Sequence, residues 1–139
     1  MKILVAGSRE LDPEFYVSMA WGLGDEIWQT FLWKDVSEHK EYVTGAAQGI
    51  DQIPFFFEEE YGDIVHKFPA DWGKHGKAAG YIRNKEMAEF CDAAVIIWDG
   101  KSKGTRHMIN LMLDSGKPLC LYVVPRNRGE TAYQLEETP

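Results

Sequence analysis

Five short apolar runs punctuate the chain, and the segments between them carry apolar residues every three or four positions. Each run has the length of one β-strand, and the spacing between the runs is typical of helices with one apolar face. Strands are predicted at residues 3–6, 41–44, 64–68, 93–98 and 118–124. Residues 93–98 are apolar throughout, which is expected of a central strand covered by helices on both faces.

The helical pattern is clearest after the first apolar run. Asp12 and Pro13 are typical of a helix start. Apolar residues then recur every four positions, at Phe15, Met19, Leu23, Ile27 and Phe31. This pattern predicts a helix that runs to about residue 30. Further helices are predicted at residues 50–61, 77–90 and 105–114.

Strands and helices alternate, so the predicted fold class is α/β with a mostly parallel five-stranded sheet. Right-handed crossovers place helices on both faces of the sheet and give a three-layer sandwich. The predicted strand order is 3-2-1-4-5, which places the loops after the first and fourth strands beside a ligand cleft. A single domain is predicted over residues 1–125, and the polar residues 126–139 are predicted to form a C-terminal tail or edge segment.

Length and composition fit one globular domain. The chain has 139 residues, and 45% of them are hydrophobic, which is enough for a core without disulfides or metals. No apolar stretch approaches the roughly 20 residues of a membrane span, and the first apolar run is too short for a signal peptide. Cys91 and Cys120 lack metal-ligand spacing and are predicted to be buried free thiols. Free thiols indicate a cytoplasmic location, which is the host cytoplasm for a phage-encoded protein.

The charge balance restricts the partners. Acidic residues number 22 and basic residues 15, which gives a net charge of −7. This charge disfavours a broad nucleic-acid groove, which depends on Lys and Arg, but it is compatible with a small basic pocket. No metal site and no cofactor are predicted, because the histidines show no ligand spacing. They are His39, His66, His75 and His107.

Four of the predicted strands lead into loops that contain small or polar residues. These loops lie at residues 7–9, 44–51, 69–84 and 99–105. In an open parallel sheet, all loops of this kind leave from the carboxyl ends of the strands, where ligands bind. The sequence therefore predicts one composite site, and the loop chemistry indicates a phosphate-bearing ligand.

The first two loops offer turns, a hydroxyl and charged groups. Arg9 has the planar fork that matches phosphate oxygens, and a plain tight turn with a solvated arginine is the alternative. The second loop opens a helix, whose first amides favour an anion. Asp51 either caps these amides or accepts a hydrogen bond from a ribose hydroxyl. The ligand-binding candidates here are Gly7, Ser8, Arg9, Gly45, Ala46, Gly49 and Asp51.

The third loop carries an aromatic residue and positive charge. Trp72 is costly to expose, and its indole stacks well on a nucleobase, although packing on the domain surface is the alternative. Gly76 and Gly80 keep the following helix start narrow, so a ligand or another helix can approach it. The binding candidates of this loop and of the helix that follows it are Asp71, Trp72, Lys77, Arg83 and Asn84.

The fourth loop follows the central strand. Gly104 and Thr105 open a helix, so their amides and the threonine hydroxyl suit a phosphate group. His107 is a candidate acid or base, or else a structural histidine. The binding candidates of this loop are Gly100, Ser102, Gly104 and Thr105.

The four segments together resemble a known protein family. In chain order they are GSRE, TGAAQGID, PADWGKHGKAAGYIRN and WDGKSKGTRH. They resemble the small bacterial and phage proteins of the DUF2493 group within the SLOG superfamily, which also holds the LOG phosphoribohydrolases and the DNA-processing protein DprA. The resemblance spans roughly residues 1–124. It implies a Rossmann-like fold and a site for nucleotides or nucleotide-derived ligands.

The resemblance also bears on catalysis. In LOG enzymes an arginine in an RK..M helix and a glutamate after a GGxGT motif act together to hydrolyse an N-glycosidic bond. Arg83 and Met87 match the arginine segment, and Gly104 and Thr105 match the GT of the motif. The chain departs from the pattern where the glutamate should follow, because Arg106, His107 and Met108 stand there.

These features leave three functions open. The first is a sensor or capture module that binds a nucleotide or a phosphoribosyl or ADP-ribose-like derivative. The second is a hydrolase of N-glycosidic or phosphoribosyl bonds, with Arg83, Asp51 and His107 as the catalytic candidates. The third is single-stranded DNA binding of the DprA kind, which the net charge disfavours.

The predicted first helix is rich in aromatic residues, namely Trp21, Trp28, Phe31 and Trp33. Surplus aromatic residues on a surface are typical of interfaces, so this helix is a candidate surface for a homo-oligomer. Packing of the same rings in the core is the alternative.

Overall fold

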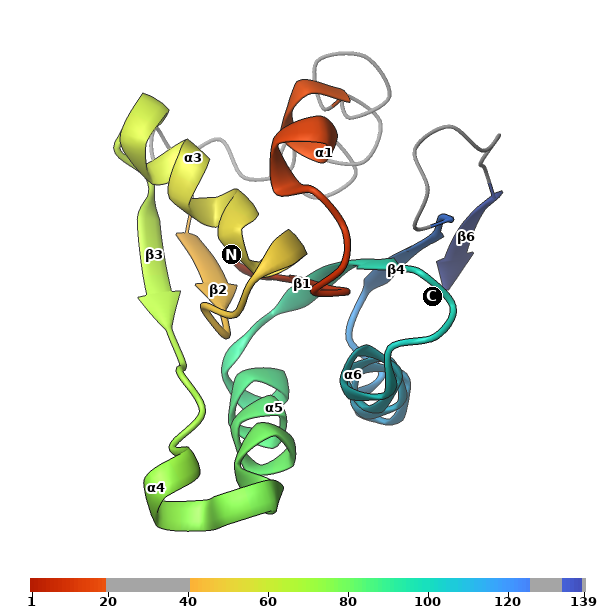
Figure 1. Cartoon of the computed structure of the whole chain (residues 1–139). Coiled ribbons are helices and arrows are strands. Elements are labelled where there is room, and N and C mark those ends of the chain that lie inside the picture. The colour runs from red at the N-terminus through yellow and green to blue at the C-terminus, as the bar shows by residue number, and fades with distance from the viewer. Residues whose placement is uncertain (20–40, 126–133, 139) are drawn as a thin grey trace.

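The fold places six strands in one sheet between two layers of helices (Figure 1). The computed structural model describes residues 1–19, 41–125 and 134–138. The strand order is β3-β2-β1-β4-β5-β6. The strands are β1 (Lys2–Gly7), β2 (Glu41–Thr44), β3 (Ile64–Lys67), β4 (Ala93–Trp98), β5 (Leu119–Val123) and β6 (Gln134–Thr138).

The strand pairing confirms the predicted topology and adds a strand. The first five strands are parallel and lie in the predicted order. β6 pairs antiparallel with β5, so part of the segment predicted as a tail or edge segment lies in the sheet. This Rossmann-like α/β arrangement directs the loops after β1, β2, β3 and β4 to one edge.

The helices differ from the prediction mainly in their starts. They are α1 (Pro13–Met19), η1 (Gly49–Gln52), α3 (Ile53–Tyr61), α4 (Trp72–His75), η2 (Gly76–Ala78), α5 (Ala79–Phe90) and α6 (Lys103–Ser115). The helix predicted at residues 77–90 is present as η2 and α5. A short helix that was not predicted, α4, precedes it, and Asp71 caps α4 by accepting a hydrogen bond from Lys74 N. Gly76, with φ of 59° and ψ of −136°, then turns the chain between α4 and η2.

Alternate side chains of each central strand enter two different cores. Ile3 and Val5 of β1 face the core shared with α3, whereas Leu4 and Ala6 face the core shared with α5 and α6. Figure 1 shows the same division, with α1 and α3 on one side of the sheet and α5 and α6 on the other. Burial on both faces explains why residues 93–98 contain no charged side chain.

The structure also bears on the predictions about the cysteines, membrane spans and the aromatic first helix. Cys91 and Cys120 are buried and free, as predicted. Within the described ranges, no helix is long and apolar enough to cross a membrane. The four rings predicted as an oligomer surface, and the predicted helix beyond Met19, lie outside the described residues.

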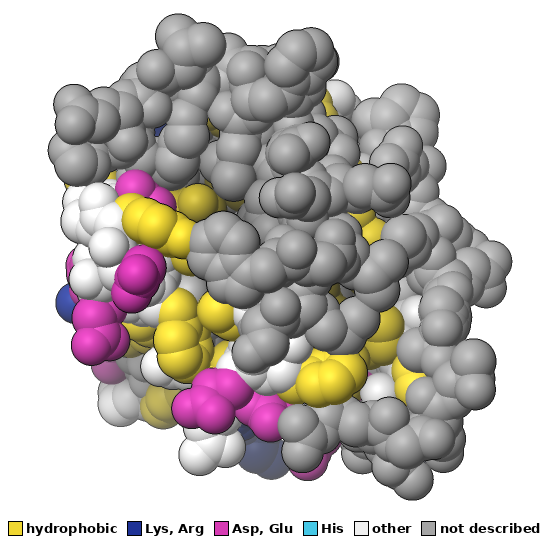
Figure 2. Space-filling model, turned by 90° about the horizontal axis from the view of Figure 1, so that it is seen from above, with side chains coloured by type: hydrophobic (Ala, Val, Ile, Leu, Met, Phe, Trp, Pro, Cys, Tyr) yellow, Lys and Arg dark blue, Asp and Glu magenta, His cyan; other side chains and the backbone are white. Residues whose placement is uncertain are grey.

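Acidic side chains gather on the side of the molecule formed by α1 and α3. Figure 2 shows them over α3, beside hydrophobic side chains. Glu58, Glu59 and Glu60 are exposed at the end of this helix, and none of them lines the cleft described below. The negative charge of α3 is thus separate from the loops at the carboxyl edge of the sheet.

Candidate ligand-binding cleft

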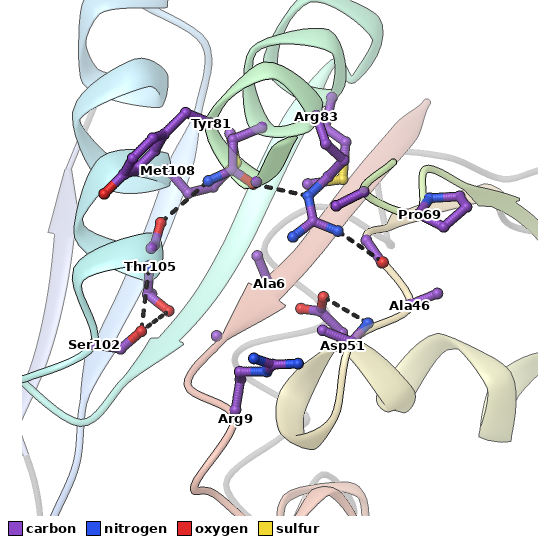
Figure 3. Close-up of a pocket in the computed structure, with 18 of the residues that line it drawn as sticks. Ala6, Arg9, Ala46, Asp51, Pro69, Tyr81, Arg83, Ser102, Thr105 and Met108 are labelled. Carbon is purple, nitrogen blue, oxygen red and sulfur yellow. Dashed lines mark hydrogen bonds between the residues drawn. The ribbon is translucent and has the colours of Figure 1, made fainter. Parts of the chain in front are cut away.

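One cleft of about 460 Å³ opens at the carboxyl edge of the sheet. Its walls come from all four predicted loops and from the first turns of α5 and α6. Figure 3 shows the end of β1 running between these walls, with Ala6 at the floor. The volume is within the range of small-molecule sites, about 300–1,000 Å³.

In the turn after β1, Ser8 has a structural role and Arg9 lines the cleft. Ser8 is fully buried, and its hydroxyl accepts a hydrogen bond from Asp99 N at 2.9 Å. Ser8 N donates to Ile97 O at 3.1 Å, so both polar ends of Ser8 tie the turn to β4. The hydroxyl predicted to meet a ligand is therefore used inside the protein, and the exposed Arg9 lines the cleft instead.

The loop after β2 is shaped by two close approaches. A Cβ on Gly45 would collide with Arg83 Nη1 and lie 2.9 Å from Asp51 Oδ2, so only glycine lets these two side chains flank the loop. Gly49 has φ of 78°, a Cβ on it would collide with the carbonyl oxygen of Ser8, and it does not line the cleft. Ala46 has φ of 58°, a conformation that costs a non-glycine residue about 1 kcal/mol and recurs at functional sites.

Arg83 of α5 joins the second and third loops. Its Nη1 donates to Gly45 O at 2.8 Å and to Phe68 O at 3.2 Å. Its Nε donates to Asn84 Oδ1 at 3.1 Å. Burial lowers the pKa of Arg83, while the nearby Asp51 carboxylate opposes this change. The Nη2 group has no hydrogen-bond partner among the described residues and is directed to the cleft (Figure 3).

Asn84 connects Arg83 to the opposite wall. It is buried, and its Nδ2 donates to Gly104 O at 3.2 Å and lies 3.2 Å from His107 Nδ1. Because Nδ2 is a donor, His107 accepts through Nδ1 and carries its proton on Nε2. Burial lowers the pKa of His107, which favours this neutral form. His107 thus lies behind Asn84 and is not a lining residue of the cleft.

Asp51 is a buried carboxyl group in the wall of the cleft. Its side chain is 6% exposed, and Oδ2 accepts a hydrogen bond from Ala47 N at 3.2 Å. Burial raises the pKa of Asp51 to about 6. Hydrogen bonds from the backbone amides of Ala47 and Gly7, and the charges of Arg83 and Arg9, only partly oppose this increase. A carboxyl group of this kind in a cleft is a candidate functional residue.

We predict that Asp51→Asn stabilises the protein at neutral pH and not at low pH. The folded-state pKa of Asp51 is about 6, against 3.8 for a solvent-exposed aspartate of the unfolded chain. Because the folded pKa is the higher one, wild-type stability falls as pH rises from about 4 to about 6, by roughly 2–3 kcal/mol. Asparagine keeps an oxygen for Ala47 N and does not ionise.

Chemical denaturation of both proteins at pH 4.5 and pH 7.5 measures this effect. Between pH 4.5 and pH 7.5, the free energy of unfolding of the variant should increase by about 2 kcal/mol relative to that of the wild type. If the difference in unfolding free energy between the two proteins does not change with pH, ionisation of Asp51 does not destabilise the folded state.

The first turn of α6 forms the opposite wall. Ser102 caps the helix, with Oγ accepting from Thr105 N at 3.3 Å and lying 3.0 Å from Thr105 Oγ1. Asp99 holds the preceding turn by accepting from the amides of Lys101 and Ser102, both at 2.9 Å. Gly104 has no atom within 4 Å of the position of a Cβ, so the helix start is open. The first turn contains no acidic side chain.

Two exposed aromatic rings stand at the rim of the cleft. Trp72 is 57% exposed and Tyr81 is 49% exposed, and both line the cleft. A Cβ on Gly80 would lie 3.5 Å from Trp72 Cη2, so the indole lies close to Gly80 at the start of α5. Tyr81 meets the His107 ring edge to face, with centroids 4.5 Å apart. Tyr81 belongs to α5 and was not among the predicted site residues.

The structure brings most of the predicted site residues to the cleft. They are Gly7, Arg9, Gly45, Ala46, Asp51, Trp72, Lys77, Arg83, Asn84, Ser102, Gly104 and Thr105. The predicted residues outside the cleft are Ser8, Gly49, Asp71, Gly100 and His107. These five cap helices, shape turns or support a lining residue. The cleft also includes residues that were not among the predicted site residues, chiefly Tyr81 and the apolar Met87 and Met108.

The cleft offers no cluster suited to a metal. Among the described residues, no group of three or more His, Cys, Asp or Glu side chains is placed to hold a metal ion. A second hollow, of about 320 Å³, lies between α1 and α3 and is bordered by Asp12, Glu14 and Glu59. Its acidic border does not suit an anionic ligand.

The fold and the cleft define a Rossmann-like α/β protein whose loops form one composite cleft at the carboxyl edge of a parallel sheet. The chain is 30% identical over 111 residues to the Gene 61 protein of Mycobacterium phage D29, covering 69% of this chain and 89% of the phage protein. The chain belongs to the family of this phage protein. No protein-family model matches the chain, and no solved structure matches it.

Proposed function

We propose that this protein binds a nucleotide or a nucleotide-derived ligand, of the phosphoribosyl or ADP-ribose kind, as a sensor or capture module. The observation that carries the proposal is the convergence in one cleft of two arginines, an open helix start and two exposed aromatic rings. Arginines and a helix start are suitable partners for a phosphate group, and aromatic rings are suitable partners for a nucleobase.

The phosphate would bind between the arginines and α6. Arg9 and the Nη2 group of Arg83 supply fork-shaped donors, and Lys77 adds a mobile positive charge. The amides at the start of α6 and the hydroxyls of Ser102 and Thr105 suit the same group. All these donors lie on a protein with a net charge of −7, which supports a small basic site rather than a nucleic-acid groove.

The base would stack at the rim. Exposed indole and phenol rings cost solvation energy unless a partner covers them, and a flat heteroaromatic base is a suitable partner. Trp72 and Tyr81 flank Gly80, which has no side chain to obstruct a ring placed between the loop and α5.

A hydrolase of N-glycosidic or phosphoribosyl bonds is the second candidate, and Asp51 favours it. A carboxyl group with a pKa of about 6 suits proton transfer near neutral pH. Arg83 would stabilise the developing negative charge. His107 is less suited to this role, because its Nδ1 faces Asn84 and not the cleft.

We also propose that the family of the phage protein is part of the SLOG superfamily, close to the DUF2493 group. The support is the order of the four loop motifs together with a sheet that brings them to one edge. We propose a cytoplasmic location, because both cysteines are buried free thiols.

Saturation-transfer NMR tests the function with a panel of AMP, other nucleoside monophosphates, NAD and ADP-ribose, each followed over hours. Transfer to an unchanged ligand is the expected result for a sensor or capture module. Release of free base that depends on Arg83 would favour the hydrolase. Absence of both signals across the panel would contradict the proposal.

We expect Trp72→Ala to weaken nucleotide binding by about 10-fold while changing stability by less than about 0.5 kcal/mol. The reason is that Trp72 is largely exposed and buries little area on folding, whereas a stacked base would cover it. Isothermal titration with the ligand found by NMR measures the effect. Tyr61→Ala is the matched control, because Tyr61 is 46% exposed and lies on α3 outside the cleft. Equal losses in the two variants would contradict stacking at Trp72.

A further inference from the structure

The two side walls of the cleft require different chemical groups. Figure 3 shows Asp51 on one side of the end of β1, and Ser102 and Thr105 on the other side. The wall at α6 favours an anion, because it combines a helix start with hydroxyls and has no acidic side chain in its first turn. The wall at Asp51 favours a hydrogen-bond donor. A ligand that touches both walls therefore carries a hydroxyl or amino group as well as an anionic group.

Among the described residues, the carboxyl group of Asp51 has backbone partners but no side-chain partner. The backbone amides of Ala47 and Gly7 donate hydrogen bonds to it, and no described side chain does so. Arg83 and Arg9 are near enough to affect it electrostatically, yet neither forms an ion pair with it within the described part of the chain. A buried carboxylate without such a partner is costly, and a donor from a ligand would offset that cost.

The surroundings of Asp51 favour a sugar hydroxyl as that donor. Gly45 is the residue between Asp51 and Arg83, and its missing side chain keeps both groups at the cleft wall. The carboxyl group thus lies beside donors for an anion. A phosphorylated ribose has the matching arrangement, since its hydroxyls and its phosphate are carried on one small ring. A cationic donor fits less well, because Arg9 and Arg83 would repel it.

We infer that Asp51 is a specificity-determining residue that accepts a hydrogen bond from a ribose hydroxyl, so that the cleft selects phosphorylated ribose derivatives over their deoxyribose counterparts. This inference rests on the proposed function and narrows it. It assigns the sugar, and not only the phosphate and the base, as a group that the protein recognises.

Isothermal titration with AMP, 2′-deoxy-AMP, 3′-deoxy-AMP and ribose 5-phosphate tests the inference at pH 7.5. The wild type should bind AMP about 10- to 100-fold more tightly than at least one of the deoxy forms, the effect of one hydrogen bond to a charged group. Ribose 5-phosphate should bind measurably without a base. Asp51→Asn should weaken AMP binding and reduce the preference for ribose to about 3-fold or less.

The outcomes separate this inference from the proposed function. Equal binding of AMP and both deoxy forms by the wild type would overturn the role of Asp51 and leave nucleotide binding intact. A preference for ribose that Asp51→Asn retains would overturn it as well. The wild-type comparison decides the matter even if the variant does not fold. If none of the four compounds binds, and no compound of the wider NMR panel gives a signal, the proposed function itself is contradicted.

Discussion

Replacing Arg83 with alanine should lower the affinity for a nucleotide by about 100-fold or more. In the proposed function the Nη2 group of Arg83 donates to the ligand phosphate, and the loss of a charged hydrogen bond of this kind costs about 1.5–3 kcal/mol. The same change removes the donor for Gly45 O and Phe68 O, so the second and third loops lose two of the hydrogen bonds that hold them in place. It also removes a positive charge from beside Asp51, whose pKa should rise above its value of about 6.

Two further variants make this result specific. Arg83→Lys keeps the charge but cannot reach two loop carbonyls and a phosphate at once, so we expect an intermediate loss. Arg106→Ala removes an exposed arginine on α6 outside the cleft and should leave affinity nearly unchanged. Titration calorimetry measures all three variants, and circular dichroism checks their folding. If Arg83→Ala and Arg106→Ala lower the affinity equally, the affinity depends on the overall charge of the protein and not on a specific contact of Arg83.

The largest loss of stability is expected for Gly7→Ala. A Cβ on Gly7 would collide with the backbone oxygen of Ile97 and lie 2.6 Å from Ile50 Cβ. Gly7 pairs with Ile97 at the centre of the sheet, so neither backbone can move without breaking the ladder between β1 and β4. We expect the free energy of unfolding to fall by about 3 kcal/mol or more, because a close-packed site cannot accept an added methyl group.

Gly104→Ala is the matched control for this substitution. No atom lies within 4 Å of the position of its Cβ, and alanine favours a helix over glycine, so stability should stay constant or rise by up to about 1 kcal/mol. Urea denaturation of both variants measures the difference. Similar unfolding midpoints for Gly7→Ala and the wild type would show that the turn after β1 is less tightly packed than described.

Much of the fold could be predicted because its signals are local. An unbroken apolar run such as residues 93–98 is stable only when both of its faces are covered, which requires helices on both sides of a parallel sheet. The position of the cleft follows from the same topology, since loops that leave parallel strands at their carboxyl ends must meet. Arg9, Asp51 and Arg83 were therefore predicted to lie together, and they do.

The sequence did not indicate which side chains of a loop face the cleft. Ser8 and Arg9 are neighbours, yet pairing of β1 with β4 buries Ser8 against Asp99 and leaves Arg9 exposed. Tyr81 was missed because an aromatic residue inside a helical pattern has no signal that separates a rim position from a core position. The short helix α4 was also missed, because Trp72–His75 lie in a glycine-containing segment that is typical of a loop.

The alternation of strands and helices, and the edge at which the loops meet, follow from the amino-acid sequence, because the alternation depends on patterns within about 20 residues. The arrangement of Gly45, Asp51 and Arg83 depends on tertiary packing, since the hydrogen bond from Arg83 to Gly45 joins positions 38 residues apart. Only the tertiary structure decided that Asp51 is buried and that its pKa is raised. Burial and the distance between charges depend on the packing of elements that are remote in the chain, and no local pattern specifies them.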